Sequence, residues 1–450
     1  MAHATETAEL LPKEPIDTLV DPFKRFLHVE SASGVVLLAA TLTALGLANS
    51  SLSEVFLAFW KKKLGFTVGS FQMIHSLQHW INDGLMAIFF FVIGLEVKRE
   101  LVIGELRDLK QATLPILGAI GGMVVPAGIY LLLQYGRPGA RGWGIPMATD
   151  IAFVVGCLAV LGPRIPKGLR VMLLSLAIAD DIGAILVIAI GYTQNLNFIA
   201  LVGGIIGIAV ALGLMKVGLR NAAVYILLMI LVWFAFHESG IHATIAGVIF
   251  GLLTPTQAWI SEGRLHTIVD RTTHFLQGDG WRSSGERYAM LRQMERAARK
   301  TISPLERCET DLHPWVGFVI MPLFALANAG VPVQLADFAN PVATAVGLGL
   351  LAGKPIGIVL FSWLAVKTGL AKLPAGIGWG ALTGGGFLAG IGFTMALFIA
   401  SLALSGELLD AAKVGILGGS VLAATAGVIL LLWFLPKSSP AERGSEGGGS

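Results

Sequence analysis

Twelve long apolar stretches dominate this chain and restrict what it can fold into. A helix needs about 20 predominantly apolar residues to cross a bilayer, and stretches of comparable length recur here between short polar loops. Alternating strand patterns are missing, so a membrane barrel is not indicated. The sequence therefore predicts an all-α membrane protein of about twelve transmembrane helices, at approximately 33–49, 80–97, 112–134, 145–163, 171–192, 196–215, 223–236, 241–254, 315–333, 341–366, 378–404 and 412–435.

The composition agrees with a helical bundle in lipid. Of 450 residues 55% are hydrophobic and 14% charged, too apolar for a soluble chain of this size. The 56 glycines favour close helix packing. The net charge of +3 is spread over several loops without a basic, aromatic-interleaved stripe, which argues against nucleic acid as a partner. Cys157 and Cys308 give neither a disulfide framework nor a metal-ligand spacing.

The distribution of lysine and arginine predicts the orientation. The positive-inside rule favours cytoplasmic termini, with few exceptions on the other side: Lys61, Lys62, Lys63, Arg137, Arg141 and Lys413. We expect residues 1–31 to form a cytoplasmic tail, either disordered or with a short surface helix. The transmembrane domain should span 32–435 with one long cytoplasmic loop at 255–312, helical near 286–300. A flexible cytoplasmic tail at 436–450 and an extracytoplasmic hairpin within 60–72 complete the prediction.

Four ionisable residues lie at membrane depth. Asp150, Asp180, Asp181 and Lys354 are each flanked by apolar residues, and such groups by default mark ion or substrate pathways. Because consecutive helical residues point about 100° apart, the two adjacent aspartates should have different partners. We expect Lys354 to pair with Asp180, since a buried charge needs a counter-charge. Asp181, helped by Asp150, would then bind a small hard cation or a proton.

The alternative is a structural ion-pair network that locks helices together. Three carboxylates face one lysine in these segments, so at least one acid lacks a protein cation, and a purely structural network would not keep that surplus in lipid. The surplus favours an ion pathway.

Two of the apolar segments contain helix-breaking residues. Gly144 and Pro146 precede Thr149 and Asp150 in the fourth segment. The stretch LTGGGFLAGIGFTM of the eleventh is weakened by Gly384, Gly385, Gly386, Gly390 and Gly392. Interrupted helices expose half-helix ends that can meet an ion. Their places in three-helix groups at 112–192 and 341–435 fit inverted-topology repeats. Ordinary glycine packing is the alternative.

A second group of charges closes the second apolar segment and precedes the ninth. The end of the second segment carries Glu96, Arg99 and Glu100, and the stretch before the ninth segment carries Glu309. Coupled titration of such groups could bias the conformation with pH. A solvated helix end fits the spacing equally well.

These residues lie in a series of motifs that closely resembles the NhaA family of bacterial sodium/proton antiporters. The resemblance covers roughly residues 25–435, through DGLMAIFFFVIGLEVKREL, IPMATDIAF, AIADDIGAI, SGIHATIAGV, LHPWV, LFALANAGV, AGKPIGI and GIGFTMALFIASL. Transporters of this family are built from inverted-topology repeats, so the resemblance implies the same arrangement here.

The resemblance implies a role for each site residue. Asp180 and Asp181 match the family's ion-binding aspartates, which are the ligands of the metal ion. Asp150 and Thr149 match the residues at the broken-helix crossing. Lys354 matches the charge-compensating lysine. Glu96, Arg99, Glu100 and Glu309 match a cytoplasmic pH-response cluster.

The same resemblance implies the activity. We expect electrogenic exchange of Na+ or Li+ for more than one proton across a bacterial inner membrane. Exchange should be activated at alkaline pH, need no cofactor, and be carried out by a homodimer formed partly through the hairpin.

Three rival functions remain to be weighed. An intramembrane aspartyl protease, the enzyme alternative, is disfavoured because its aspartates lie on separate helices, whereas two are adjacent here and accompanied by a lysine. A non-transporting assembly protein is disfavoured by the buried charges. A transporter for K+ or an organic substrate stays open, because cavity size and carbonyl placement set ion selectivity.

Overall fold

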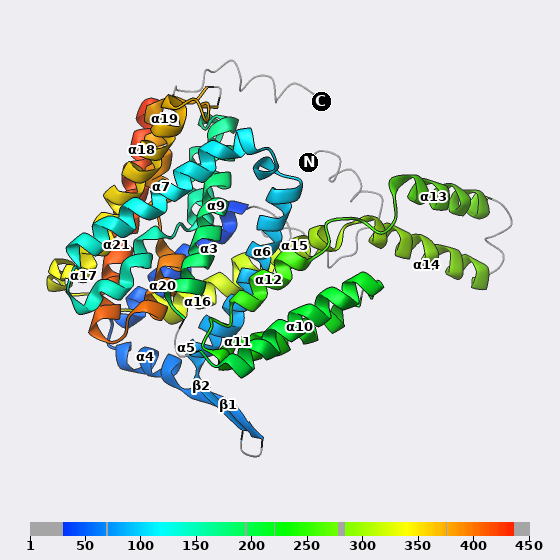
Figure 1. The fold of residues 1–450 in the computed structure, drawn as a ribbon, viewed down its shortest axis with the longest axis horizontal. Helices are drawn as coiled ribbons and strands as arrows, with labels where there is room; N and C mark the ends of the chain where they lie inside the picture. Colours follow the sequence, from blue (N-terminus) through cyan, green and yellow to red (C-terminus); the bar gives the residue numbers. More distant parts are fainter. Residues whose placement is uncertain are drawn as a thin grey trace. The chain divides into compact units, whose positions relative to one another are not determined.

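The computed structural model describes residues 30–68, 71–193, 196–219, 221–277, 284–374 and 376–435. Within these ranges the chain is almost entirely helical, with one two-stranded hairpin (Figure 1). The expected tails at 1–31 and 436–450 lie outside the described residues, except for residues 30 and 31 at the start of the first helix.

The helices confirm a multi-span membrane architecture. Eight are long and apolar enough to cross a bilayer, and up to eleven spans result if each of three bent helix pairs is counted as one. The stretch expected at 241–254 contains only the nine-residue helix α12 (Ile245–Leu253). At about 1.5 Å per residue, α12 covers roughly half of a hydrocarbon core of about 30 Å. It is preceded by Gly240 in a left-handed conformation, which ends the helix before it.

The described chain forms two compact units. The first takes in Met1–Asn82, Lys110–Tyr192 and Pro314–Ser450, and the second Asp83–Leu109 and Thr193–His313.

The first unit contains both segments in which the sequence predicts a break. Its helices pack closely at glycines: a Cβ placed on Gly357 would lie 2.0 Å from the carbonyl oxygen of Gly121, so the two backbones touch. Its main elements are α3 (Glu30–Ala48), α4 (Ser53–Lys61), α5 (Leu77–Trp80), α7 (Leu109–Leu133), η4 (Pro138–Met147), α8 (Ile151–Leu161), η5 (Gly162–Arg164), α9 (Lys167–Gly191), η7 (Val316–Ile320), α16 (Met321–Asn328), η8 (Leu335–Ala339), α17 (Pro341–Leu348), η9 (Gly349–Gly353), α18 (Lys354–Lys367), α19 (Trp379–Ala389), α20 (Phe393–Ala403) and α21 (Glu407–Phe434).

The hairpin expected within 60–72 is present in this unit, but it extends further along the chain. Strand β1 (Lys63–Val68) pairs antiparallel with β2 (Phe71–Ser76), in a register that sets Lys63 opposite Ser76 and Val68 opposite Phe71. Both glycines that mark the hairpin in the sequence, Gly65 and Gly69, lie before residue 72, whereas the pairing continues for four residues beyond it.

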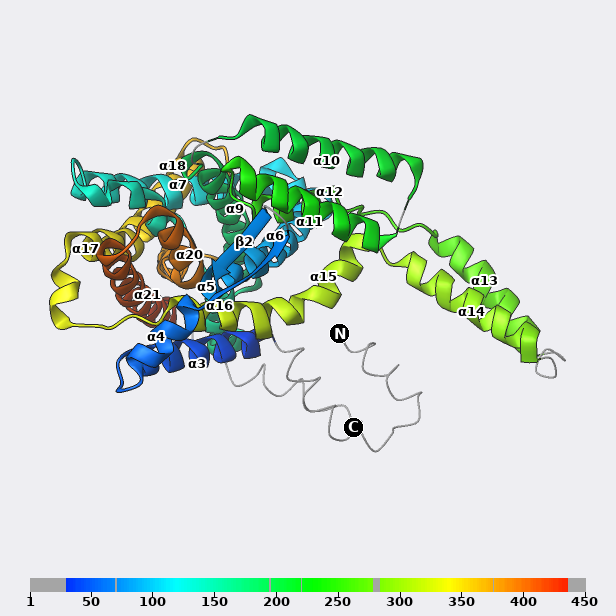
Figure 2. The same cartoon turned by 90° about the horizontal axis from the view of Figure 1, so that it is seen from below.

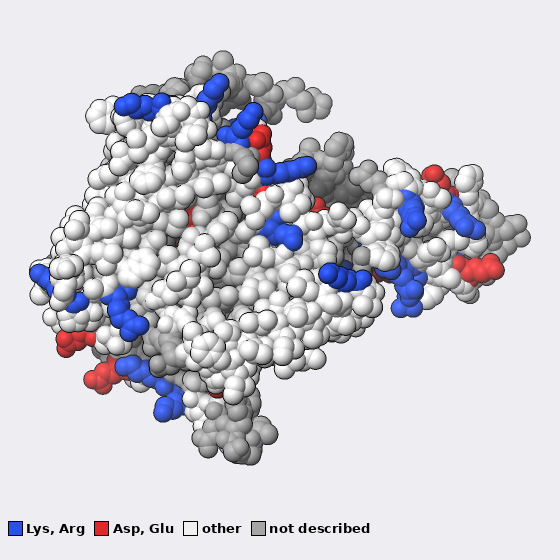
Figure 3. Space-filling view, in the orientation of Figure 1, with Lys and Arg blue, Asp and Glu red and all other residues white. Residues whose placement is uncertain are grey.

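The visible side of the first unit has the charge distribution of a membrane protein. Over α7 and α18 the middle of the surface is nearly free of charged side chains, and lysines and arginines gather toward its two ends (Figure 3). Such an apolar band suits contact with lipid tails.

The second unit contains the long polar segment expected at 255–312, which is mostly helical. The helices α13 (Glu262–Gln277) and α14 (Ser284–Thr301) lie side by side as a pair (Figures 1 and 2). Helix α14 covers the stretch predicted to be helical near 286–300. The remaining elements are η2 (Ile81–Leu85), shared with the first unit, α6 (Met86–Val102), η3 (Glu105–Arg107), α10 (Phe198–Val217), α11 (Ala222–Ser239), α12 and α15 (Pro304–Trp315).

Candidate functional site: crossed helix breaks and buried charges

Both predicted helix breaks are present in the first unit. The elements η4 and α8 meet at an angle of 41°, and α19 and α20 meet at 47°. In the first pair, Ala148 and Asp150 have extended backbone conformations, and Asp150 caps α8 by accepting a hydrogen bond from the amide of Phe153 (3.4 Å). In the second pair, Gly390–Gly392 separate the two helices. The interruptions leave half-helix ends in the interior.

Direct hydrogen bonds join the two breaks. The Asp150 amide donates to the carbonyl of Ile391 (2.7 Å), and the Thr149 hydroxyl donates to the carbonyl of Ala389 (2.9 Å). In the other direction the Thr394 amide donates to Asp150 Oδ2 (3.0 Å), and the Thr394 hydroxyl donates to the same oxygen. Two stretches of unwound backbone thus satisfy each other's polar groups, as a buried backbone requires.

Asp150 lies at the N-terminal ends of two half-helices. One of its oxygens accepts from the first turn of α8 and the other from the first turn of α20. Helix N-termini carry a partial positive charge, so a carboxylate between two of them is electrostatically favoured. Both oxygens of Asp150 are therefore engaged by protein donors.

The expected ion pair between Asp180 and Lys354 is present. The Lys354 ammonium lies 2.6 Å from Asp180 Oδ2 and also donates to the carbonyl of Met147, the last residue of η4. Lys354 is 0% exposed and Asp180 1% exposed. The lysine thus neutralises one carboxylate and satisfies a carbonyl at the C-terminal end of the first half-helix, where positive charge is favourable.

The two oxygens of the Asp180 carboxylate differ in their hydrogen bonding. Asp180 Oδ1 is buried and has no hydrogen-bond partner within the described part of the chain. The backbone and hydroxyl of Thr149 lie close to the Asp180 carboxylate. An unsatisfied buried oxygen requires an explanation such as a bound ion or water.

Asp181 follows on the same helix, α9, and is 3% exposed. Its carboxylate interacts electrostatically with the Lys354 ammonium, whose direct ion pair is with Asp180. The structure therefore brings Thr149, Asp180, Asp181 and Lys354 together, beside the crossing where Asp150 lies. Carboxylate and hydroxyl oxygens are the donors that small hard cations prefer.

The predicted charge cluster lies in the second unit and involves α6 and α15. Arg99 forms an ion pair with Glu309 and lies 3.7 Å from Glu100, and His313 lies 4.0 Å from Glu96. The Arg99 side chain is 42% exposed, so this network is in contact with water while Glu309 is largely covered. The structure brings Glu96, Arg99, Glu100 and Glu309 close together, as the sequence indicated.

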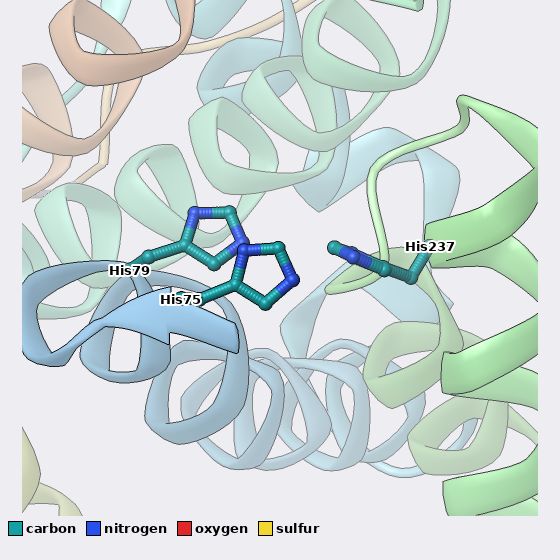
Figure 4. A group of neighbouring side chains, drawn as sticks. All are labelled: His75, His79 and His237. Atoms are coloured by element: carbon teal, nitrogen blue, oxygen red, sulfur yellow. The ribbon is translucent and has the colours of Figure 1, made fainter. Parts of the chain in front are cut away.

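Several polar residues with notable contacts were not singled out from the sequence. Thr394 is one of them. The sequence shows only a threonine in the first turn after a glycine break, because its partner Asp150 is 244 residues away in the chain. His75 of β2 and His79 of α5 are two more, with stacked rings whose centroids are 4.3 Å apart (Figure 4). In the second unit His237 of α11, also labelled in Figure 4, lies 3.7 Å from Asp83.

Several membrane spans, two crossed helix breaks, and buried carboxylates with one compensating lysine define a secondary transporter for a small cation. The sequence profile described as Na+/H+ antiporter 1 matches residues 24–431. The chain belongs to this family, which confirms the resemblance.

Named relatives agree over nearly the whole length. A protein of Rhodopirellula baltica named Na(+)/H(+) antiporter NhaA is 55% identical over 96% of this chain and 98% of its own. A protein of the same name from Rhizobium meliloti is 53% identical, covering 94% of this chain and 96% of its own. Na(+)/H(+) antiporter NhaA 2 of Vibrio vulnificus is 49% identical, covering 94% and 95%.

Proposed function

We propose that this protein exports Na+ or Li+ in exchange for protons across a bacterial inner membrane, with the Asp180–Asp181 pair as the shared binding site. Na+/H+ antiport is the activity in the name of the family to which the chain belongs. The observation that carries the site assignment is that, of two adjacent buried carboxylates, Asp180 forms the direct ion pair with Lys354. Asp180 has a lysine within 2.6 Å, and one of its oxygens is left without a partner among the described residues.

Charge balance then links the two ions. The Lys354 ammonium can neutralise one of the two adjacent carboxylates, so the site carries a surplus negative charge when both are ionised. A desolvated surplus charge is unfavourable, and either a sodium ion or protons can neutralise it. Since both use the same oxygens, occupancy by one excludes the other and exchange becomes obligatory.

Each remaining residue has a separate part in this proposal. Thr149 and Asp180 Oδ1 would supply oxygen ligands next to Asp181. Asp150 would hold the two interrupted helices together through its capping bonds and neutralise their positive ends. Lys354 compensates the charge of Asp180 and of the η4 C-terminus. A substrate cation would thus meet a small number of preorganised oxygen atoms in a dry environment.

Transport also needs alternate access to the two sides. We infer twelve membrane segments in inverted-topology repeats, with α12 as the shortened segment, both termini in the cytoplasm, and a homodimer that uses the β1–β2 hairpin. More than one proton per sodium would make the exchange electrogenic.

The Arg99–Glu309 network of the second unit would couple transport to cytoplasmic pH. Its members are joined by ion pairs and contact water, so protonation of one changes the stability of the others. Sodium export would then respond to alkaline pH and salt.

The test is proton movement in inside-out vesicles, recorded with a pH-sensitive dye after addition of NaCl, LiCl or KCl. We expect Na+ and Li+ to release protons in wild type, and Asp181→Asn to abolish the signal while the folded protein is present at the same level. Exposed Asp410→Asn is the matched control and should transport normally. A signal with K+ alone would replace this proposal with antiport of another cation.

A further inference from the structure

Lys413 is a nearly buried cation far along the chain from the transport site. It lies in the second turn of α21 and is only 7% exposed. Among the described residues no hydrogen bond or ion pair reaches its ammonium group, which distinguishes it from Lys354. A buried ammonium without a counter-charge is strongly unfavourable.

The charges nearest to Lys413 do not supply a matching anion. Asp410, one turn earlier on α21, attracts Lys413, but Lys61 at the end of α4 repels it. Both are exposed at the surface. The charges that act on Lys413 are thus one carboxylate of its own helix and one ammonium group from the end of α4, which leaves one positive charge in excess among the three. We call this group of charges the α4–α21 junction, after the two helices, which are labelled in Figure 1.

A third donor comes from the residue that precedes Lys61 on α4. Trp60, the residue before Lys61, is 8% exposed, and its indole N–H is buried without a hydrogen-bond partner in the described ranges. Buried N–H groups nearly always have an acceptor. The short segment Trp60–Lys61 and residue Lys413 together contribute three donors for which the described protein offers no hydrogen-bond acceptor.

The place of this junction in the fold suggests what supplies the acceptor. It lies where α4 ends and α21 begins, at the termini of apolar segments, where lipid headgroups surround a membrane protein. Lys61 and Lys413 also belong to the few basic residues on the side that the positive-inside rule expects to be poor in them. Basic pockets between helix ends of membrane proteins bind anionic headgroups.

We propose that Lys413 and Lys61, with the indole of Trp60 beside them, form a site for the phosphate group of an anionic phospholipid. A phosphate diester supplies one negative charge and several acceptor oxygens, which offset the excess charge and accept from the donors at the α4–α21 junction. The site holds a structural lipid and takes no part in ion exchange.

Thermal unfolding of the delipidated full-length protein in detergent tests this assignment. Phosphatidylglycerol, phosphatidylcholine and inorganic phosphate are each titrated against wild type, Lys413→Met and Lys61→Gln. Lys62→Gln is the matched control, since it removes the same charge from the next residue. Lys61→Gln changes only an exposed side chain, so it keeps the test valid if Lys413→Met does not fold.

We expect phosphatidylglycerol to raise the Tm of wild type and of Lys62→Gln, with little effect of the other two additives. In Lys413→Met the half-saturating lipid concentration should rise about tenfold or more, as loss of a charge-assisted hydrogen bond predicts, with a smaller rise in Lys61→Gln. Equal stabilisation by phosphatidylcholine, or an equal response of all variants, would overturn the proposal. A Lys413-dependent effect of inorganic phosphate alone would assign the site to the free ion instead of a lipid.

Discussion

Replacing Lys354 by methionine tests the buried ion pair on which the site is built. The substitution removes a donor to Asp180 Oδ2 at 2.6 Å and to the Met147 carbonyl, both in a fully buried place. Breaking a buried pair from one side costs about 3–5 kcal/mol, and a buried carbonyl left without its donor about 1–3 kcal/mol. Since one ammonium group satisfies both, we expect a total loss of about 4–6 kcal/mol of unfolding free energy.

The double variant Lys354→Met/Asp180→Asn separates this pair from general damage to the core. With the carboxylate neutralised, methionine no longer faces an uncompensated charge, so the double variant should recover about 2–3 kcal/mol relative to the sum of the single changes. The free energy of unfolding is measured by denaturant titration in mixed micelles for wild type, Lys354→Met, Asp180→Asn and the double variant. Lys367→Met is the control, because it makes the same change at an exposed position of the same helix, and it should cost less than about 1 kcal/mol. Additive single effects would refute the reasoning.

Three further changes test the helix crossing, the packing and the pH response. Thr394→Val removes the hydroxyl that donates to Asp150, so it should slow Na+-driven proton release about tenfold. Thr394→Ser keeps the hydroxyl and should stay near wild type. Equal rates for the two variants would show that the hydroxyl is dispensable. Gly357→Ala places a Cβ 2.0 Å from the Gly121 carbonyl oxygen and should lower stability by about 1–3 kcal/mol, while Gly128→Ala, which meets no atom within 4 Å, should not; a thermal unfolding series in which both behave alike contradicts the packing. Glu309→Gln removes the ion-pair partner of Arg99 and should move the midpoint of the pH profile of Na+/H+ exchange by about half a pH unit or more. Its maximal exchange rate should stay within about twofold of wild type. An unchanged midpoint would argue against a sensing role.

Much of the architecture follows from local sequence physics. Hydropathy identifies most of the spans because each apolar run is long relative to its loops. The four buried charges stand out for the same reason. The pairing of Lys354 with Asp180 follows from charge balance, since Lys354 is flanked by apolar residues on both sides, whereas Lys413 lies at the start of its apolar segment. Proline and glycine mark both breaks because proline removes a helical hydrogen bond and glycine has a low helix propensity. They do not suffice by themselves, since α7 continues through Pro115 and Pro126.

What the sequence does not reveal depends on contacts between distant segments. Nothing local indicates that the Thr394 side chain meets Asp150, or that the carbonyls of Ala389 and Ile391 accept from the other break. The short length of α12 is set by how the chain enters and leaves it at Gly240 and Thr254, which an apolar count over 241–254 does not detect. The near-burial of Lys413 is likewise a tertiary property, because its sequence position indicated only a charge at the start of an apolar segment.

The most direct test of the central claim is isothermal titration calorimetry of Na+ binding to the purified protein, in buffers of different ionisation enthalpy so that released protons are counted. If Na+ and H+ share the Asp180–Asp181 site, Na+ binding to wild type releases protons and weakens as the pH falls. Asp181→Asn should then show neither effect. Undiminished Na+ binding by Asp181→Asn with the same proton release, or Na+ binding to wild type without any proton release, would contradict a shared site.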